Sequence, residues 1–390
     1  MKIALSFPAC HRRGGVERVV YECGRYLASR GHHVHILAGT WQEDVESFAQ
    51  CQRIEHQQRP AFMRGLSYHR QCTEFLKDFD CDVLNTHGVV CPTGGVMWVQ
   101  SLHAAWLERG RSMLRAASWR AMQRRLNPLH PIILRLEDKH FKRRAYKKLI
   151  ATTSAVRDDL GRFYGVPAED VVIIPNGFNP EEFSPHRRSE HRAAMRKKLG
   201  LKPDQFALLF VANELERKGF KTILGALRAM GRRDVRLIVV GSPPTAMVSH
   251  MAAHHGVAEM VIAAGSTSHV ADYHAAADLF VLPTQYEAFC LAIIESLGSG
   301  LPVVTSTVSG AGDAIQPGIN GQVVRDPNNA EELAAVLKPM LDHDALAVYS
   351  AGTPATAEDY QWPKLLAKYE QVLVESCNAQ HSTLNLESQS

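Results

Sequence analysis

The sequence predicts an α/β protein made of two doubly wound, Rossmann-like domains. Three observations carry this prediction. Apolar runs of strand length alternate with segments of helical periodicity along most of the chain. The chain has 390 residues, which is too many for a single core. A polar stretch with two prolines at 176–200 separates two series of alternating elements, so we expect the domain linker there.

The first half of the chain opens with a strand–helix–strand unit. Residues 2–7 and 33–38 are apolar runs, and between them apolar side chains recur at steps of three and four residues: Val16, Val19, Val20, Cys23 and Leu27. This order predicts a helix that ends at Gly31 and crosses between two parallel strands. Further strands are expected at 82–87, 97–103, 149–154 and 171–175, with Ser154 as the N-cap of a helix before the last one.

The alternation restarts after residue 200. Strands are expected at 206–212, 235–241, 260–265, 278–284 and 302–306, and helices from Gly219, at 269–277 and at 288–299. The predicted domains are therefore 1–180 and 200–355, with a C-terminal helix at 362–375 that packs back on the first domain. Residues 376–390 have no periodicity and are predicted to be disordered.

Composition limits the class of protein. Apolar residues make up 45% and charged residues 22%, which excludes collagen-like, disordered and coiled-coil chains. No apolar run approaches the ~18 residues of a membrane helix. The short apolar run at the N-terminus is followed at once by His11, Arg12 and Arg13, unlike a signal peptide, so we expect a cytoplasmic protein. The eight cysteines form no C-x-x-C pair, and we expect free thiols and no zinc.

The positive charge is concentrated in one segment. The formal net charge is +4, but residues 106–148 hold thirteen Lys or Arg against three acidic residues, a net +10. One interpretation is a pair of solvated helices. The other is contact with an anionic membrane surface, because apolar residues are interleaved with the arginines: Trp106, Leu107, Trp119, Leu126, Ile132, Ile133 and Leu134. Nucleic-acid binding would explain this segment but not the second domain.

Two glycines are a candidate ligand contact in the first domain. Gly14 and Gly15 follow the first strand and precede the first helix, where a phosphate or sugar could approach the helix N-terminus. A flexible turn is the plainer explanation, and the dinucleotide pattern G-x-G-x-x-G is absent.

The segment 278–306 carries two spaced carboxylates. Glu287 follows a buried strand, and Glu295 lies eight residues later on the predicted helix, roughly 12 Å away at 1.5 Å per residue. This separation is too large for two carboxylates acting on one atom. It suits one extended ligand with a hydroxylated head, an anionic middle and a ribose, which are the parts of a nucleoside diphosphate sugar. A solvated helix face is the alternative.

The same segment resembles the E-x7-E signature of the family-4 retaining glycosyltransferases of GT-B fold. The resemblance extends to residues 7–37, to IPNGFNPEEF at 174–183, to ERKG at 216–219 and to residues 309–324. Within the family the sequence is most similar to bacterial lipopolysaccharide core glucosyltransferases. The resemblance implies two domains that face each other across a cleft, with the acceptor bound by the first and the nucleotide sugar by the second.

The resemblance implies roles for individual residues. Glu287 would contact hydroxyls of the donor sugar, and Glu295 the ribose. Arg217 and Lys218 would hold the diphosphate, aided by backbone N–H groups of Phe289, Cys290 and Leu291. His103, at the end of a predicted strand, would lie near the transferred sugar, and His87 is a weaker alternative.

Two positions depart from the family pattern. Ala212 stands where an arginine is common, so diphosphate binding must depend on Arg217, Lys218 and the helix terminus. Asp313 stands where a glutamate is commoner.

The sequence therefore predicts a retaining hexosyltransferase. Its donor would be a nucleoside diphosphate sugar, UDP-glucose in the first instance, and its acceptor a sugar hydroxyl of a glycolipid or glycan such as lipopolysaccharide core. No cofactor or metal is expected, because no D-x-D pair stands at a strand end. Front-face attack and a covalent intermediate both remain open. The alternatives are a nucleotide-sugar-binding protein without turnover and a nucleotide-sugar epimerase of the same fold.

Overall fold

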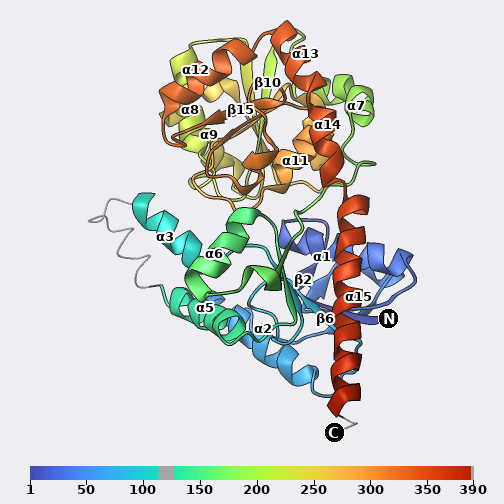
Figure 1. Cartoon of the computed structure of the whole chain (residues 1–390). Coiled ribbons are helices and arrows are strands. Elements are labelled where there is room, and N and C mark those ends of the chain that lie inside the picture. Colours follow the sequence, from blue (N-terminus) through green and yellow to red (C-terminus); the bar gives the residue numbers. More distant parts are fainter. Residues whose placement is uncertain (114–126, 388–390) are drawn as a thin grey trace. The chain divides into compact units, whose positions relative to one another are not determined.

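The computed structural model describes residues 1–113 and 127–387 and consists of two compact units. The first unit contains Met1–Asn176 and the chain from Pro363 onward, and the second contains Gly177–Trp362. Each unit is a parallel sheet with helices packed on it (Figure 1). The predicted two-domain α/β fold is confirmed.

The sheet of the first unit has seven strands in the order β5-β3-β1-β6-β7-β8-β9. The strands are β1 (Lys2–Ser6), β3 (His33–Ala38), β5 (Gln50–Arg53), β6 (Val83–Thr86), β7 (Val96–Val99), β8 (Lys148–Ala151) and β9 (Val171–Ile173). All of their pairings are parallel. The chain builds outward from β1 to β5 and then returns to place β6 on the other side of β1. The topological switch point, where ligands bind in such sheets, is therefore between β1 and β6.

The helices of the first unit follow the apolar periodicity. They are α1 (Val16–Ser29), α2 (Ala61–Phe75), α3 (His103–Met113), α5 (Leu129–Glu137), α6 (Ser154–Tyr164) and α15 (Trp362–Glu387). The N-cap of α6 is Thr153, where the sequence predicted Ser154. Thr153 has an extended backbone, and its hydroxyl accepts the Val156 N–H at 3.2 Å, so it completes the first turn one residue earlier.

The C-terminal helix α15 is longer than predicted. It continues to Glu387, so the expected disorder from residue 376 is wrong as far as that residue. The apolar stripe of the helix goes on through buried Leu373 to buried Cys377. Further back, Tyr369 packs its ring 5.2 Å from that of Trp98. Residues 388–390 lie outside the described part of the chain.

The sheet of the second unit has six parallel strands in the order β12-β11-β10-β13-β14-β15. The strands are β10 (Phe206–Val211), β11 (Val235–Val240), β12 (Val261–Gly265), β13 (Leu279–Leu282), β14 (Val303–Ser306) and β15 (Gly321–Val324). Its helices are α7 (Pro185–Lys198), α8 (Phe220–Met230), α9 (Thr245–His254), α10 (Val270–Ala276), α11 (Leu291–Gly298), α12 (Ala330–Met340), α13 (His343–Ala351) and α14 (Thr353–Ala357). The switch point here is between β10 and β13.

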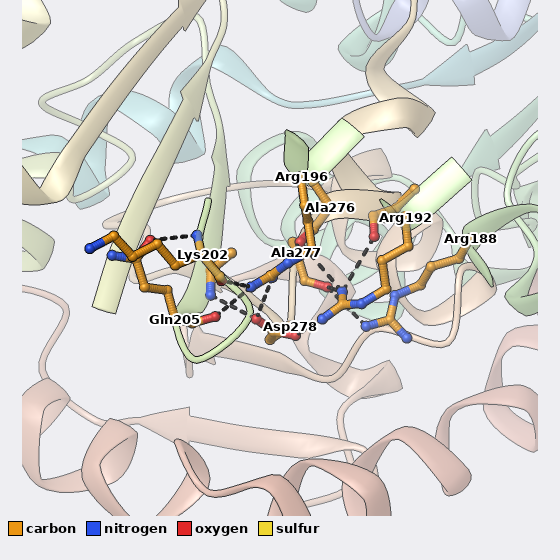
Figure 2. A network of polar contacts seen from close by, with 10 residues as sticks. Arg188, Arg192, Arg196, Lys202, Gln205, Ala276, Ala277 and Asp278 are labelled. Carbon is orange, nitrogen blue, oxygen red and sulfur yellow. Dashed lines mark hydrogen bonds and ion pairs between the residues drawn. The ribbon is translucent and has the colours of Figure 1, made fainter. Parts of the chain in front are cut away.

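The predicted linker at 176–200 is mostly a helix. Helix α7 starts with Ser184 as its N-cap and Pro185 in its first turn. Three arginines spaced by one turn reach the end of α10, which Figure 2 shows: Arg188, Arg192 and Arg196. All three donate to backbone carbonyls at the α10 C-terminus, where positive charge is stabilising. The polar stretch that we predicted as the domain linker therefore contains a helix that is anchored to the end of α10.

Candidate functional site

The charged residues singled out in the second unit come together at its switch point. Lys218 lies in the turn that follows β10, and Glu287 lies in the segment that follows β13. These strands are hydrogen-bonded neighbours, so the two segments leave the same edge of the sheet side by side.

Two glycines let these segments approach at backbone level. Gly219 has φ +83°, and a Cβ there would lie 2.1 Å from the carbonyl oxygen of Pro283. A Cβ on Gly310 would lie 1.7 Å from the carbonyl oxygen of Ala288. Gly310 also donates its N–H to the carbonyl of Glu287 at 2.8 Å. The position of Glu287 is therefore set by backbone contacts on both sides.

The Glu287 carboxylate lies between two cations. Its Oε2 forms an ion pair with Lys218 Nζ and lies 3.1 Å from Arg217 Nη1. Arg217 also donates to the backbone carbonyl of Tyr286 and, through two nitrogens at 3.1 Å each, to both oxygens of Glu214. The Lys218 and Glu287 side chains are only 12% and 16% exposed. Charges with so little exposure to water are unfavourable unless they are paired with each other or with a ligand.

The protonation of this cluster follows from burial and pairing. Hydrogen bonds from Arg217 hold the pKa of Glu214 below its usual value. Burial alone would lower the pKa of Lys218, but the neighbouring Cys290 sulfur and the Glu287 carboxylate both raise it, and the net effect is a raised pKa. Lys218 is therefore an ammonium at neutral pH. Such a group can bind phosphate oxygens, and a neighbouring carboxylate can accept from sugar hydroxyls.

Helix α11 begins at Leu291, three residues later than predicted. Cys290 is its N-cap, with Phe289 before it, and no described side chain caps the helix N-terminus. Backbone N–H groups at such a terminus can bind an anion. Burial raises the pKa of Cys290, so its thiol is neutral although Lys218 Nζ is 3.9 Å away. Burial thus disfavours the thiolate form of Cys290.

Glu295 lies on α11 and is buried, so neither carboxylate of the E-x7-E pattern is on a solvated face. The predicted spacing assumed a helix from 288, whereas only the residues from Leu291 onward are helical. Asp313 lies in the short 3₁₀ segment Gly310–Ala314, and Ala212 is buried after β10. Ala212 therefore contributes no cation to the charged cluster.

In the first unit, the two glycines lie where they were predicted. Gly15 is the N-cap of α1, and Gly14 has φ +93°, a conformation that side chains disfavour. No described side chain caps this helix N-terminus either.

His103 is the first residue of α3, four residues beyond the end of β7, and not a strand end. Its backbone N–H donates to the Glu137 carboxylate at 2.5 Å, and the Ala104 N–H does so at 3.1 Å. The Tyr164 hydroxyl donates to the same carboxylate. His103 Nε2 lies 3.0 Å from His130 Nδ1. Glu137 thus stabilises the first turn of α3, where His103 lies.

Sequence reasoning missed Glu137 and Glu214. Glu137 is 34 residues from His103 along the chain, and no spacing rule connects them. Glu214 could have been noticed, because it lies three residues before Arg217 in a turn. The charged cluster belongs to the second unit, whereas Gly14, Gly15 and His103 belong to the first.

Two family models match the chain, one for each unit. "Glycosyltransferase Family 4" matches residues 13–182, and "Glycosyl transferases group 1" matches residues 191–349. The first contains the glycine turn and His103. The second contains Lys218, Glu287 and helix α11.

Similar proteins carry related names. A D-inositol 3-phosphate glycosyltransferase of Thermobispora bispora is 32% identical over 61% of this chain, and the match spans 58% of that protein's length. The lipopolysaccharide glucosyltransferase WaaG of Escherichia coli is 25% identical over 85% of this chain and 87% of its own.

Solved structures show the same fold. The crystal structure of WaaG, a glycosyltransferase involved in lipopolysaccharide biosynthesis, has a TM-score of 0.83 and 23% identity, covering 95% of this chain and 99% of that one. Anabaena Alr3699/HepE in complex with UDP-glucose has a TM-score of 0.74 and 17% identity, covering 96% and 100%.

Proposed function

The chain belongs to the glycosyltransferases of GT-B fold, and on this premise we propose that it transfers a hexose, with retention, from a UDP-sugar. UDP-glucose is the first donor to test, and a sugar hydroxyl of a glycolipid such as lipopolysaccharide core is the acceptor. The name of the Escherichia coli relative supports this choice. The Thermobispora relative is matched over little more than half its length, so its substrate carries less weight.

The observation that carries the proposal is the pairing of Lys218 and Arg217 with Glu287. Without donor, both cations are neutralised by the protein's own carboxylates. A diphosphate that binds at Lys218 and at the N-terminus of α11 would take over one of these partners, which releases Glu287 to accept hydrogen bonds from sugar hydroxyls. The cluster thus offers partners for the diphosphate and for hydroxyls of the donor sugar.

The chemistry requires stabilisation of charge that develops on the departing diphosphate. Lys218, Arg217 and the N–H groups before α11 are fixed before the reaction begins, so they stabilise that charge without reorganisation. No metal is required in this scheme. Front-face attack and a covalent intermediate are both compatible with it, and His103 is proposed to lie near the transferred sugar.

Donor binding should raise the thermal stability of the protein without added metal. At a UDP-glucose concentration of about 100 Kd the gain should be about 2.7 kcal/mol. Differential scanning fluorimetry with UDP-glucose, in EDTA and in magnesium, is the measurement. No stabilisation by any nucleotide sugar, or stabilisation only with magnesium, would contradict it. Release of UDP from the same donor, accelerated by a glycan acceptor, distinguishes transfer from binding alone and from epimerisation.

We place the enzyme at the cytoplasmic face of a membrane, where a glycolipid acceptor would lie. None of the described helices is long and apolar enough to cross a bilayer. Within the basic segment 106–148, several described cations have protein partners: Arg109 pairs with Asp159, Lys142 with Asp138, and Lys148 donates to the Glu169 carbonyl. The arginines at 115, 120, 124 and 125, with Trp119 and Leu126, lie outside the described residues. We therefore keep the whole segment 106–148 as the proposed membrane contact.

The protein should sediment with anionic liposomes at low salt. If three or four arginines face the lipid, each contributes about 1 kcal/mol, so binding strengthens by roughly a few hundredfold over neutral liposomes. The effect should disappear at 1 M salt, where screening acts within about 3 Å. Equal binding to anionic and neutral liposomes would contradict the proposal. A double variant with Arg124→Gln and Arg125→Gln is the control, because it lacks two of these positive charges.

A further inference from the structure

A set of neutral polar side chains lies at the carboxyl ends of the strands on one side of the first sheet. His87 directly follows β6, Gln100 follows β7, Thr152 follows β8, and Asn176 comes three residues after β9. These strands are consecutive neighbours, and β6 borders the switch point. The set therefore occupies the edge at which open α/β sheets bind ligands.

The register of the strands puts these residues on one face. Thr86 is opposite Met97, so His87 comes opposite Trp98, and the two rings stack with centroids 5.8 Å apart. In the same way Val99 is opposite Ala151, which brings Gln100 opposite Thr152. Alternate residues share a face, so His87, Gln100 and Thr152 lie on the Trp98 face, whereas Thr86 lies on the other. Asn176 joins them through its Nδ2, which donates to Gln100 Oε1 at 2.9 Å.

These side chains have buried polar atoms that bond to nothing in the described part of the chain. The atoms are His87 Nδ1 and Nε2, Gln100 Nε2, Thr152 Oγ1 and Asn176 Oδ1. His87, Thr152 and Asn176 are each more than nine-tenths buried. A buried polar atom without a partner costs free energy, and five of them at one edge indicate that something other than the described residues satisfies them.

The chemistry of the set specifies the ligand. Burial lowers the pKa of His87 to about 3, so its ring is uncharged at neutral pH and has one donor and one acceptor nitrogen. Gln100 Nε2 can only donate, Asn176 Oδ1 can only accept, and the Thr152 hydroxyl can do both. An anion would leave the acceptors unsatisfied, and an ammonium would leave the donors unsatisfied. A hydroxyl group both donates and accepts.

We propose that His87, Gln100, Thr152 and Asn176 bind the hydroxyl groups of an uncharged sugar ring. The identification of this ring as part of the acceptor rests on the proposed function. The binding of a sugar ring to the set does not. The two switch points then have different chemistry. That of the second unit carries paired charges suited to a diphosphate, whereas the four side chains of the set in the first unit are uncharged at neutral pH. Phosphate groups of a glycolipid would therefore be bound elsewhere.

The test is ring-nitrogen NMR of the full-length protein labelled with ¹⁵N-histidine. The His87 signals are assigned from the spectrum of His87→Gln. Glucose, galactose, mannose and myo-inositol are titrated to 0.1 M, with sodium phosphate as the anionic probe. We expect at least one neutral sugar to shift the His87 nitrogens saturably and phosphate to leave them unchanged. A shift caused by phosphate, or no shift with any sugar, would mean that the set holds an anion or only water, and would overturn the proposal.

Two isosteric variants sharpen the test. Thr152→Val removes one hydroxyl of the set and should weaken sugar binding about 2- to 12-fold, the effect of one neutral hydrogen bond. Thr86→Val removes an equally buried hydroxyl, also without a partner among the described residues, from the opposite face and should leave the affinity unchanged. Equal effects of the two would refute the assignment to one face. Stabilisation by UDP-glucose is measured separately, so failure here and failure of the proposed function give different results.

Discussion

Asp278→Ala should destabilise the second unit by about 3 kcal/mol. Asp278 is 12% exposed and is the carboxylate between two arginines of α7, with Arg192 Nη2 at 2.5 Å and Arg196 Nη1 at 3.2 Å. Its Oδ2 also accepts the Ala207 N–H at 2.7 Å. Removing one partner of a buried ion pair costs about 3–5 kcal/mol, and the lower end applies because Arg192 is 33% exposed.

Removing the Asp278 carboxylate would also affect a third arginine, Arg188. Burial and the neighbouring Arg192 lower the pKa of Arg188 to about 10, and Asp278 opposes that shift. Without the carboxylate, three guanidinium groups would face one helix end with only backbone carbonyls as partners. Helix α7 would then lose the charge balance that holds it on α10 (Figure 2).

Hydrogen exchange is the appropriate measurement, because a two-unit chain need not unfold in one step. Amides of β10 should exchange roughly 150-fold faster in the variant, whereas amides of β1 in the first unit serve as an internal reference. Asp272→Ala is the matched control, because Asp272 on α10 also pairs with an arginine of α7. Asp272 pairs with Arg187 at 2.8 Å, but both are about 30% exposed, so its loss should cost less than about 1 kcal/mol. Equal effects of the two substitutions would contradict the assignment.

The sheets were predictable because their strands are continuous apolar runs. In β10, Phe206–Phe210 are buried on both faces, as parallel strands are, and such runs need no tertiary information to be recognised. The order of strands and helices then fixed which segments leave the same edge. The resemblance to the glycosyltransferase family implied that Lys218 and Glu287, almost seventy residues apart, bind one donor, and the two side chains are found in contact.

The errors arose where partners are distant in sequence. Helix α7 has so many charges that it was taken for a linker, but Arg196 is satisfied by Asp278, 82 residues later. Helix α15 continues through buried Cys377, and Tyr369 on the same helix packs against Trp98 of the first sheet, a contact that a local sequence window cannot show. Likewise, the sequence shows Glu137 only as an acidic residue within a basic segment. Its role depends on the hydrogen bond that its carboxylate accepts from the His103 backbone, which the sequence does not reveal.

Lys218→Ala should reduce turnover of the donor by roughly 10- to 150-fold, the loss of one charge-assisted hydrogen bond of about 1.5–3 kcal/mol. The fold should persist, because Arg217 still neutralises Glu287 at 3.1 Å. Glu287→Ala should reduce turnover to a similar extent for a different reason, since it removes the contact to the sugar. The two residues touch each other, so the double variant should lose less than the product of the single losses.

UDP binding separates the two roles. Lys218→Ala should weaken binding of UDP itself, because the diphosphate loses a cation. Glu287→Ala should leave UDP affinity equal or higher, because Lys218 no longer has a competing carboxylate. Lys221→Ala is the matched control: it lies three residues further on, is 57% exposed, and pairs only at 3.8 Å with Glu216. Steady-state kinetics and calorimetric titration with UDP measure both effects. Near-normal turnover in Lys218→Ala and Glu287→Ala, or a Lys221→Ala variant as impaired as they are, would remove the charged cluster from the donor site.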